Sequence, residues 1–198
     1  MNRQMNVTTT AEGIAAAAKA ASRESGGLPP VHLWDPPYCG DLDIRIARDG
    51  NWFYLGTPIG RPEMVRLFST ILKKEKSDYF LVTPVEKIGI TVDDAPFVAV
   101  DFTAKGRGRK QVLTFTTNVG DSVTADDEHR IRVHRDKSGE PSPYVMVRGG
   151  LEALIDRKSF YRLIERGSHN DGWFGIWSSG SFFRVIPSDE LPEGEAPA

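Results

Sequence analysis

Alternation of apolar and polar residues marks a series of short strands in this chain. Leu42, Ile44 and Ile46 alternate with polar neighbours, which predicts a half-buried strand. The pair Asp49-Gly50 favours a tight hairpin turn, and residues 52–55 then return as a second strand. From residue 64 to residue 72 the apolar positions follow a helical spacing instead, and Pro62 suits the first turn of that helix. Further strands are predicted at 79–83 and 87–92.

The same order of elements occurs again in the second half of the chain. The alternating strand, the second strand, an Ile-x-Arg entry, a short amphipathic helix and an aromatic strand all reappear. A duplicated strand-strand-helix-strand unit predicts two similar lobes, and the interface between two lobes is a frequent place for ligands. The paired segments are 44–46 with 131–133, 59–61 with 155–157, and 79–80 with 173–174.

Strands dominate the chain and each unit has one short helix, which predicts an α+β fold with largely antiparallel sheets. The Ala-, Ser- and Gly-rich start is predicted to be flexible, although residues 11–23 could form a marginal helix. The Pro- and Glu-rich end is predicted to be an acidic, disordered tail. The predicted parts are a flexible segment 1–27, an N-terminal α+β lobe 28–96, a C-terminal β-rich α+β lobe 97–187, and the tail 188–198.

Composition narrows the functional classes. The chain has 198 residues with 25 basic and 27 acidic side chains, so the net charge of -2 argues against a dedicated duplex DNA binder. Cys39 is the only cysteine, which fits a reducing compartment and allows no internal disulfide. No stretch is long and apolar enough for a transmembrane helix, so we expect a cytoplasmic protein without a membrane partner.

Catalytic motifs are weak. Ser178-Ser179-Gly180 lacks the leading glycine of a nucleophile elbow, so a hairpin turn is the favoured interpretation. Asp41 and Asp43 could face together on a strand, and the acidic stretch 121–128 could hold a divalent metal. A metal-dependent hydrolase is therefore one alternative, but we expect a protein that is not an enzyme and needs no cofactor or metal.

A basic loop provides a second alternative. Its cations could grip phosphate groups through charge, so nucleic-acid binding is possible, although a solvated hairpin tip has the same pattern. The cations are Lys105, Arg107, Arg109 and Lys110.

The duplicated arginines give a sharper hypothesis. Arg61 and Arg157 each stand at the start of a predicted helix, where a cation opposes the helix dipole. Positions that break a local rule are candidates for functional sites. The alternative is a structural ion pair with a carboxylate such as Glu86 or Glu152. Arg148, beside Gly149-Gly150, is a third candidate cation.

Several longer strings extend over the predicted folded region. They are His32-Leu33-Trp34, Gly40-Asp41, Asp49-Gly50-Asn51-Trp52, Thr83-Pro84-Val85-Glu86, Asp93-Asp94-Ala95-Pro96-Phe97, Phe115-Thr116-Thr117-Asn118 and the stretch from Tyr144 to Ile155. In these strings residues 28–187 resemble the bacterial DUF1285 family, whose name stands for domain of unknown function 1285. The resemblance implies a duplicated two-domain α+β fold, with a C-terminal domain loosely like a pleckstrin-homology barrel. It also implies a suspected regulatory or signalling role, and it transfers no catalytic residues.

The sequence therefore predicts a non-enzymatic regulatory binding module. Its expected ligand is a protein segment or a small anion, held at the interface between the two lobes. Arg61, Arg148 and Arg157 would supply positive charge there, Glu86 and Glu152 would orient them, and Trp34 or Trp52 would give apolar contact.

Overall fold

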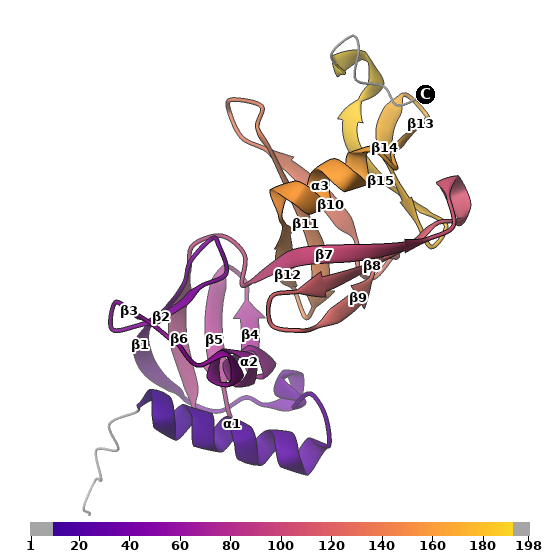
Figure 1. Cartoon of the computed structure of the whole chain (residues 1–198). Coiled ribbons are helices and arrows are strands. Elements are labelled where there is room, and N and C mark those ends of the chain that lie inside the picture. The colour runs from indigo at the N-terminus through magenta and orange to yellow at the C-terminus, as the bar shows by residue number, and fades with distance from the viewer. Residues whose placement is uncertain (1–9, 192–198) are drawn as a thin grey trace, which may run out of the picture. The chain divides into compact units, whose positions relative to one another are not determined.

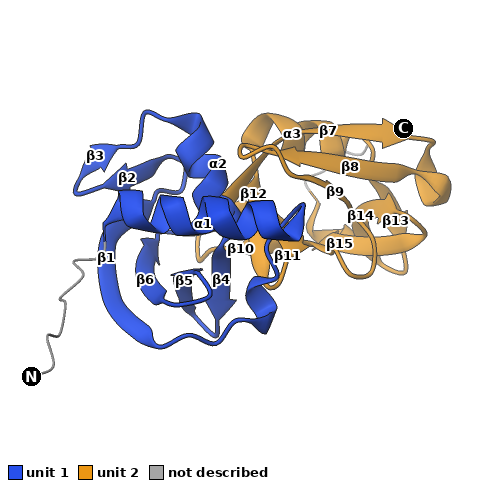
Figure 2. Ribbon diagram, turned by 90° about the horizontal axis from the view of Figure 1, so that it is seen from below, with its two compact units in different colours: residues 1–93 blue, residues 94–198 orange. Residues whose placement is uncertain are grey.

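The computed structural model describes residues 10–191 and separates into two compact units, which meet in sequence between Asp93 and Asp94 (Figure 2). The predicted α+β class with largely antiparallel sheets is confirmed in both units. The division lies close to the predicted one after residue 96. Most of the predicted acidic tail lies outside the described residues, and Ser188–Glu190 forms a short 3-10 turn.

Unit 1 is a six-stranded sheet with two helices. The strand order is β3-β2-β1-β6-β5-β4, and every neighbouring pair is antiparallel except β1 with β6, which is parallel. The elements are α1 (Ala11–Ser25), β1 (Tyr38–Ile46), β2 (Trp52–Tyr54), β3 (Thr57–Pro58), α2 (Pro62–Thr70), β4 (Leu72–Glu75), β5 (Asp78–Val82) and β6 (Lys87–Val92), with a 3-10 turn at Val31–Leu33 (Figure 1).

Unit 2 contains a six-stranded sheet, a three-stranded sheet and one helix. The sheet orders are β10-β11-β12-β7-β8-β9 and β13-β14-β15. The elements are β7 (Phe97–Lys105), β8 (Val112–Thr117), β9 (Ser122–Thr124), β10 (Ile131–Arg135), β11 (Pro141–Arg148), β12 (Leu151–Ile155), α3 (Arg157–Ile164), β13 (Ser168–Asn170), β14 (Trp173–Ser178) and β15 (Ser181–Pro187), with a 3-10 turn at Gly108–Lys110.

The duplicated series is longer than the one read from the sequence. Each unit has an antiparallel group of three strands, then a helix, then a second group of three: β1 to β6 around α2 in unit 1, and β10 to β15 around α3 in unit 2. In unit 1 the parallel pairing of β1 with β6 joins the two groups into one sheet. In unit 2 the corresponding strands β10 and β15 lie side by side, but each ends its own sheet without pairing to the other.

The N-terminal segment departs from the flexible state that we predicted. Residues 11–25 form α1, whose N-cap Thr10 accepts a hydrogen bond from the backbone N–H of Gly13. Ile14 and Ala18 are fully buried, because the apolar stripe of α1 packs on α2. Tertiary burial therefore stabilises a helix whose sequence alone predicts only marginal helicity.

Helix α2 also ends earlier than predicted. It begins with Pro62 at its first turn, as expected, but it ends at Thr70, and residues 72–75 form β4 instead of a last helical turn. Burial of Ile71 and Leu72 explains the change, since both fill the core where the chain enters the sheet. The hairpin from β4 to β5 turns at Lys76, which has a φ of 55°.

Candidate functional site

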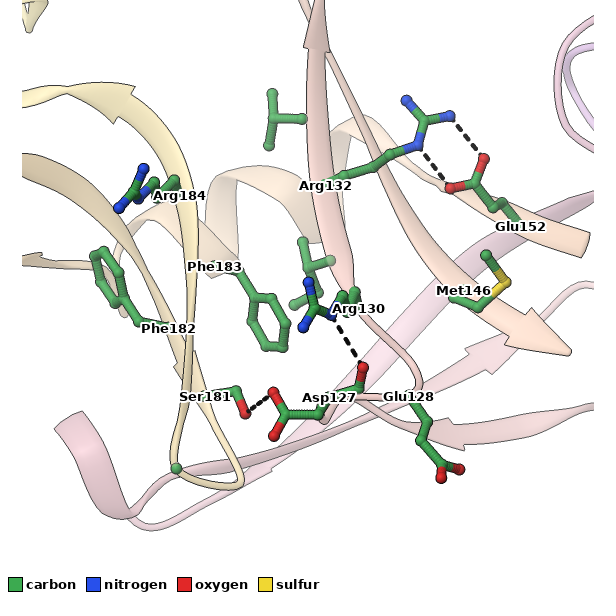
Figure 3. A pocket seen from close by; sticks show the side chains of 13 residues that line it. Asp127, Glu128, Arg130, Arg132, Met146, Glu152, Ser181, Phe182, Phe183 and Arg184 are labelled. Carbon is green, nitrogen blue, oxygen red and sulfur yellow. Dashed lines mark hydrogen bonds and ion pairs between the residues drawn. The ribbon is translucent and has the colours of Figure 1, made fainter. Parts of the chain in front are cut away.

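A groove opens in unit 2 between strands β10 and β15, which do not pair with each other. Its volume is about 780 Å³, within the range of ordinary ligand sites. Side chains from β10, β11, β12, β15 and the turn before β10 line it (Figure 3). We call this hollow groove 1. It occupies the place where unit 1 has its β1–β6 ladder, so a difference in strand pairing creates the site.

The backbone of β10 presents free hydrogen-bonding groups to groove 1. The N–H of Met146 on β11 donates to the carbonyl of Arg130 at 3.0 Å, which fixes the alternation of the ladder. Val133 stands opposite Pro143, which has no N–H, so this pair falls between the hydrogen-bonded pairs. By the same alternation Ile131 and Val133 turn their N–H and C=O groups away from β11 and toward the groove.

The backbone of β15 does the same from the other side. Strands β14 and β15 join through the two residues Ser179 and Gly180, whose φ values of 51° and 84° suit a tight hairpin turn. In such a hairpin the flanking pair Ser178 and Ser181 exchanges the hydrogen bonds. Phe182 therefore directs its N–H and C=O groups away from β14, toward the free edge.

A polar contact closes one end of groove 1. The Ser181 hydroxyl donates to the Asp127 carboxylate at 2.7 Å, which ties the start of β15 to the turn before β10. From this contact the two strands run in the same direction, with Arg130 and Arg132 along one and Phe183 and Arg184 along the other (Figure 3). The groove is thus a channel between two strand edges, closed at the Ser181–Asp127 contact and open at the other end.

The three arginines that line groove 1 differ in their ion-pair and hydrogen-bond partners. Arg132 is held by Glu152 through two hydrogen bonds of 2.6 Å, and its guanidinium lies 4.2 Å from the centre of the Tyr144 ring. Arg130 donates from Nε to the backbone carbonyl of Asp127 at 3.0 Å. Within residues 10–191 neither Arg130 nor Arg184 forms an ion pair, although Arg184 covers the Trp173 ring at 5.1 Å. Among the described residues, groove 1 therefore keeps cations without a carboxylate partner.

Comparison with known proteins assigns residues 29–185, and so both sheets of unit 2 and the sheet of unit 1, to one family. The N-terminal domain described as "Domain of unknown function (DUF1285)" matches residues 29–95, and the C-terminal domain described as "Protein of unknown function (DUF1285)" matches residues 96–185. The chain belongs to the DUF1285 family.

Two solved structures of DUF1285 family proteins are similar to this chain. The protein from Silicibacter pomeroyi DSS-3 is 64% identical, with a TM-score of 0.84 over 90% of this chain and 97% of that one. The protein from Shewanella baltica OS155 is 28% identical, with a TM-score of 0.50 over 63% of this chain and 92% of that one. None of the curated proteins matches the chain.

In unit 2 the predicted interface residues of this DUF1285 chain have other tasks. Arg148 forms an ion pair with Asp121 and lies 5.0 Å from the centre of the Phe97 ring. Glu152 holds Arg132, and its predicted role in orienting Arg61, Arg148 and Arg157 stays a prediction. Arg157 is exposed at the first position of α3, whose cap is the predicted Asp156, accepting from the Ser159 N–H at 2.7 Å.

Of the two tryptophans of unit 1 that were predicted to contact the ligand, Trp52 lies in the core and Trp34 is partly exposed. Trp52 is only 2% exposed and stacks on Phe68, because its ring fills the core between the sheet and α2, so it cannot touch a ligand at the surface. Trp34 is half-buried, and its carbonyl accepts from Lys73 Nζ. Arg61 is exposed at the N-cap of α2, 3.7 Å from the Glu12 carboxylate. Glu86 is half-buried in the turn before β6, with its N–H bonded to the Thr83 hydroxyl.

The basic loop is exposed, as its sequence predicts. Lys105 ends β7, and the other three cations lie in the turn to β8. The Arg109 guanidinium lies 4.7 Å from the centre of the Trp177 ring, so the loop packs against the β14–β15 hairpin. Nucleic-acid binding through Lys105, Arg107, Arg109 and Lys110 stays a prediction.

The acidic candidates for metal binding are dispersed. Asp41 accepts from the Tyr38 hydroxyl at 2.8 Å, a bond that raises the pKa of Tyr38. Asp126 accepts from the backbone N–H of His129, which lowers the pKa of that carboxyl. Among residues 10–191 no three acidic, histidine or cysteine side chains form a metal-binding group. In the same range no helix is long and apolar enough to cross a membrane.

Sequence reasoning missed groove 1 itself. The alternation of residues 130–133 indicates a strand with one charged face, and the structure adds that this strand is an edge. Whether β10 pairs with β15 depends on contacts across some fifty residues, and the corresponding pattern in unit 1 leads to pairing. No local signal in the sequence separates the two outcomes.

Proposed function

We propose that this protein is a non-enzymatic binding module whose C-terminal domain holds an extended segment of a partner protein in groove 1. The segment adds as a strand to the free edge of β10 that faces groove 1. The proposal assigns the module a regulatory or signalling role in the cytoplasm, in keeping with the single cysteine. The observation that carries it is the absence, in the described residues of unit 2, of the ladder that closes unit 1.

Unpaired strand edges support this function physically. An edge strand offers a row of N–H and C=O groups that another chain can pair with, and proteins usually block or cover such edges. Strand addition uses these groups for affinity and nearby side-chain pockets for specificity. Strand β10 has five residues, so it can align with about 17 Å of extended chain. Ile131 at its start and Val133 at its centre supply groups that face away from β11.

Groove 1 is favoured over the binding site that the sequence predicts around Arg61, Arg148 and Arg157. Arg148 and Glu152 already have charged partners, and Trp52 is buried in the core. Groove 1 combines free backbone groups, apolar side chains and cations without carboxylate partners in one hollow. A protein segment can use all three, whereas a small anion uses only the cations.

The test is a proline substitution on the groove-facing edge. Selection from a random peptide library on the purified protein supplies the probe, and calorimetry measures the affinity of the best peptide. Val133→Pro removes an N–H that faces the groove and places a ring in the path of the added strand. We expect this variant to lose about ten-fold or more in affinity.

A matched control separates blocked binding from damage to the sheet. Ser122 is exposed on β9, the other edge of the same sheet, and its N–H faces away from β8 by the same alternation. Ser122→Pro should leave the affinity unchanged. Equal affinities of wild type and Val133→Pro, with both variants folded by circular dichroism, would refute the proposal.

A further inference from the structure

We infer that the segment bound in groove 1 has an acidic side chain opposite Arg130 and apolar side chains opposite Ile131 and Val133. This inference rests on the proposed function and names the chemistry of the partner. It follows from the register of the sheet, from the charge of Arg130, which has no carboxylate partner within residues 10–191, and from the apolar floor of the groove.

The register decides which side chains face each other. Residues directly opposite on neighbouring strands place their side chains on the same face of the sheet. Arg130 stands opposite Met146, and Met146 opposite Glu152, so these three share the outer face. Ile131 stands opposite Val145 on the other, buried face. A strand added to β10 continues this division, with alternate side chains next to Arg130 and next to Ile131.

The charge of Arg130 favours a carboxylate on the outer face. Arg130 and Phe183 both line the groove, and the hydrogen bond from Arg130 Nε is directed to the Asp127 carbonyl (Figure 3). The two terminal nitrogens can donate to both oxygens of one carboxylate, which is the strongest common form of this contact. Arg132 is less able to do this, because Glu152 already occupies its donors.

The acidic residues of the groove set where the partner's carboxylate lies. Asp127 accepts from Ser181, and Glu128 extends away at the same closed end (Figure 3). Their negative charges disfavour an acidic side chain at that end. Arg184 adds positive charge on the opposite wall, farther along the groove. The acidic side chain of the segment therefore belongs beside Arg130 and not beyond it toward Glu128.

The floor of the groove favours apolar side chains at the alternate positions. Ile131 and Phe183 are 5% and 6% exposed, and Val133 is half-buried at the open edge. An apolar side chain opposite Val133 would remove the exposed part of that residue from water, and one opposite Ile131 would extend the buried face of the sheet. The segment thus alternates apolar and polar residues, as a strand with one buried face does.

The experiment reverses the charge of Arg130 and reads the preference of the peptide. The probe is the best capped peptide from the random library, together with versions in which its acidic residue is replaced by Gln or by Lys. Wild-type protein should bind the acidic version at least about ten-fold more tightly than the Lys version. Arg130→Glu should prefer the Lys version, and Arg130→Lys should keep the acidic preference.

Arg135 offers the matched control, since it is an exposed arginine on the same strand but does not line the groove. Arg135→Glu should leave the preference unchanged. A Val133-dependent peptide whose affinity is the same with Glu, Gln or Lys would overturn this inference and leave the proposed function standing. A peptide whose binding ignores Val133→Pro would overturn both. A doubled mass in light scattering that Val133→Pro abolishes would assign the groove to a second copy of this chain, and would likewise overturn both.

Discussion

Glu152 on β12 holds the Arg132 guanidinium of β10 across the intervening strand β11, through two hydrogen bonds of 2.6 Å. The carboxylate raises the pKa of Arg132, and the Tyr144 ring beneath the guanidinium supports the same position. One arginine of β10 is therefore neutralised within the sheet while Arg130 two residues earlier is not. This difference gives groove 1 a single dominant cation on its β10 wall.

Glu152→Gln should change binding and stability in opposite directions. The substitution releases Arg132 as a second cation next to the groove, so the affinity for an acidic peptide should rise. Arg132 is half exposed, so the free energy of unfolding should fall by only about 1 kcal/mol. Calorimetry and urea denaturation of the same preparation measure both effects. In the double variant Arg132→Gln/Glu152→Gln the gain in affinity should disappear, and a gain that persisted there would contradict this role of Arg132.

Gly175→Ala should destabilise the hairpin that forms the other wall. A Cβ at this position would lie 2.4 Å from the carbonyl oxygen of Phe183 and 2.6 Å from the Phe182 ring. The backbone carbonyl cannot move without breaking the β14–β15 ladder, so we expect a loss of about 1–3 kcal/mol. Urea denaturation followed by tryptophan fluorescence measures it. The control is Gly27→Ala, because a Cβ at Gly27, outside the sheets, would meet no atom within 4 Å. Gly172 is not suitable as a control, since its φ of 76° would add backbone strain to an alanine. Wild-type stability of Gly175→Ala would contradict the close packing.

Ile14→Ala tests whether α1 is part of the folded unit 1. Ile14 is fully buried, so its truncation should lower the stability of unit 1 by about 2–4 kcal/mol. Lys19→Ala, at an exposed position of the same helix, should change it by less than about 0.5 kcal/mol. Thermal unfolding of the two variants gives the comparison. Equal unfolding midpoints for Ile14→Ala and Lys19→Ala would indicate that α1 is a flexible segment, as composition alone predicts.

The pH dependence of unit 1 should include a contribution from Glu75. Hydrogen bonds from Lys87 at 2.9 Å and from Lys73 at 3.1 Å lower the pKa of this carboxyl below its ordinary value of 4.5. A carboxyl with a lowered folded pKa stabilises the protein above its unfolded pKa, and this stability is lost as the pH falls through the folded pKa. Wild type should therefore lose more stability than Glu75→Gln between neutral pH and about pH 3.5. Urea denaturation at the two pH values measures this loss. If wild type and Glu75→Gln lost the same free energy of unfolding, Glu75 would not contribute to the pH dependence of stability.

The sequence predicts the strands and the repeat well, because both depend on local patterns. The Asp49-Gly50 turn, the Pro62 start of α2, the Asp156 cap and the closing hairpin at Ser178–Ser181 all lie where short-range chemistry places them. Strand β12 is not among the predicted strands, although Leu151, Ala153 and Ile155 alternate with less buried neighbours in it.

The site depends on long-range pairing, which local patterns do not encode. Ile44 and Ile131 begin matching stretches of the repeat, yet β1 pairs with β6 whereas β10 does not pair with β15 beside it. The sequence does not show that Arg148 and Glu152 already have ion-pair partners, because these partners are distant along the chain. Asp121 is 27 residues from Arg148, and Arg132 is 20 residues from Glu152. Trp52 was expected at a surface because its burial depends on α2, through Phe68.

Amide hydrogen exchange, resolved by residue, tests the central claim most directly. In the free protein the N–H groups of Ile131, Val133 and Phe182 should exchange quickly, because they face groove 1, while those of Arg132 and Phe183 should be protected by their ladders. Addition of the selected peptide should protect the first group and leave the second unchanged. Protection of Ile131 and Val133 in the free protein, or fast exchange that persists with the peptide bound, would contradict strand addition in groove 1.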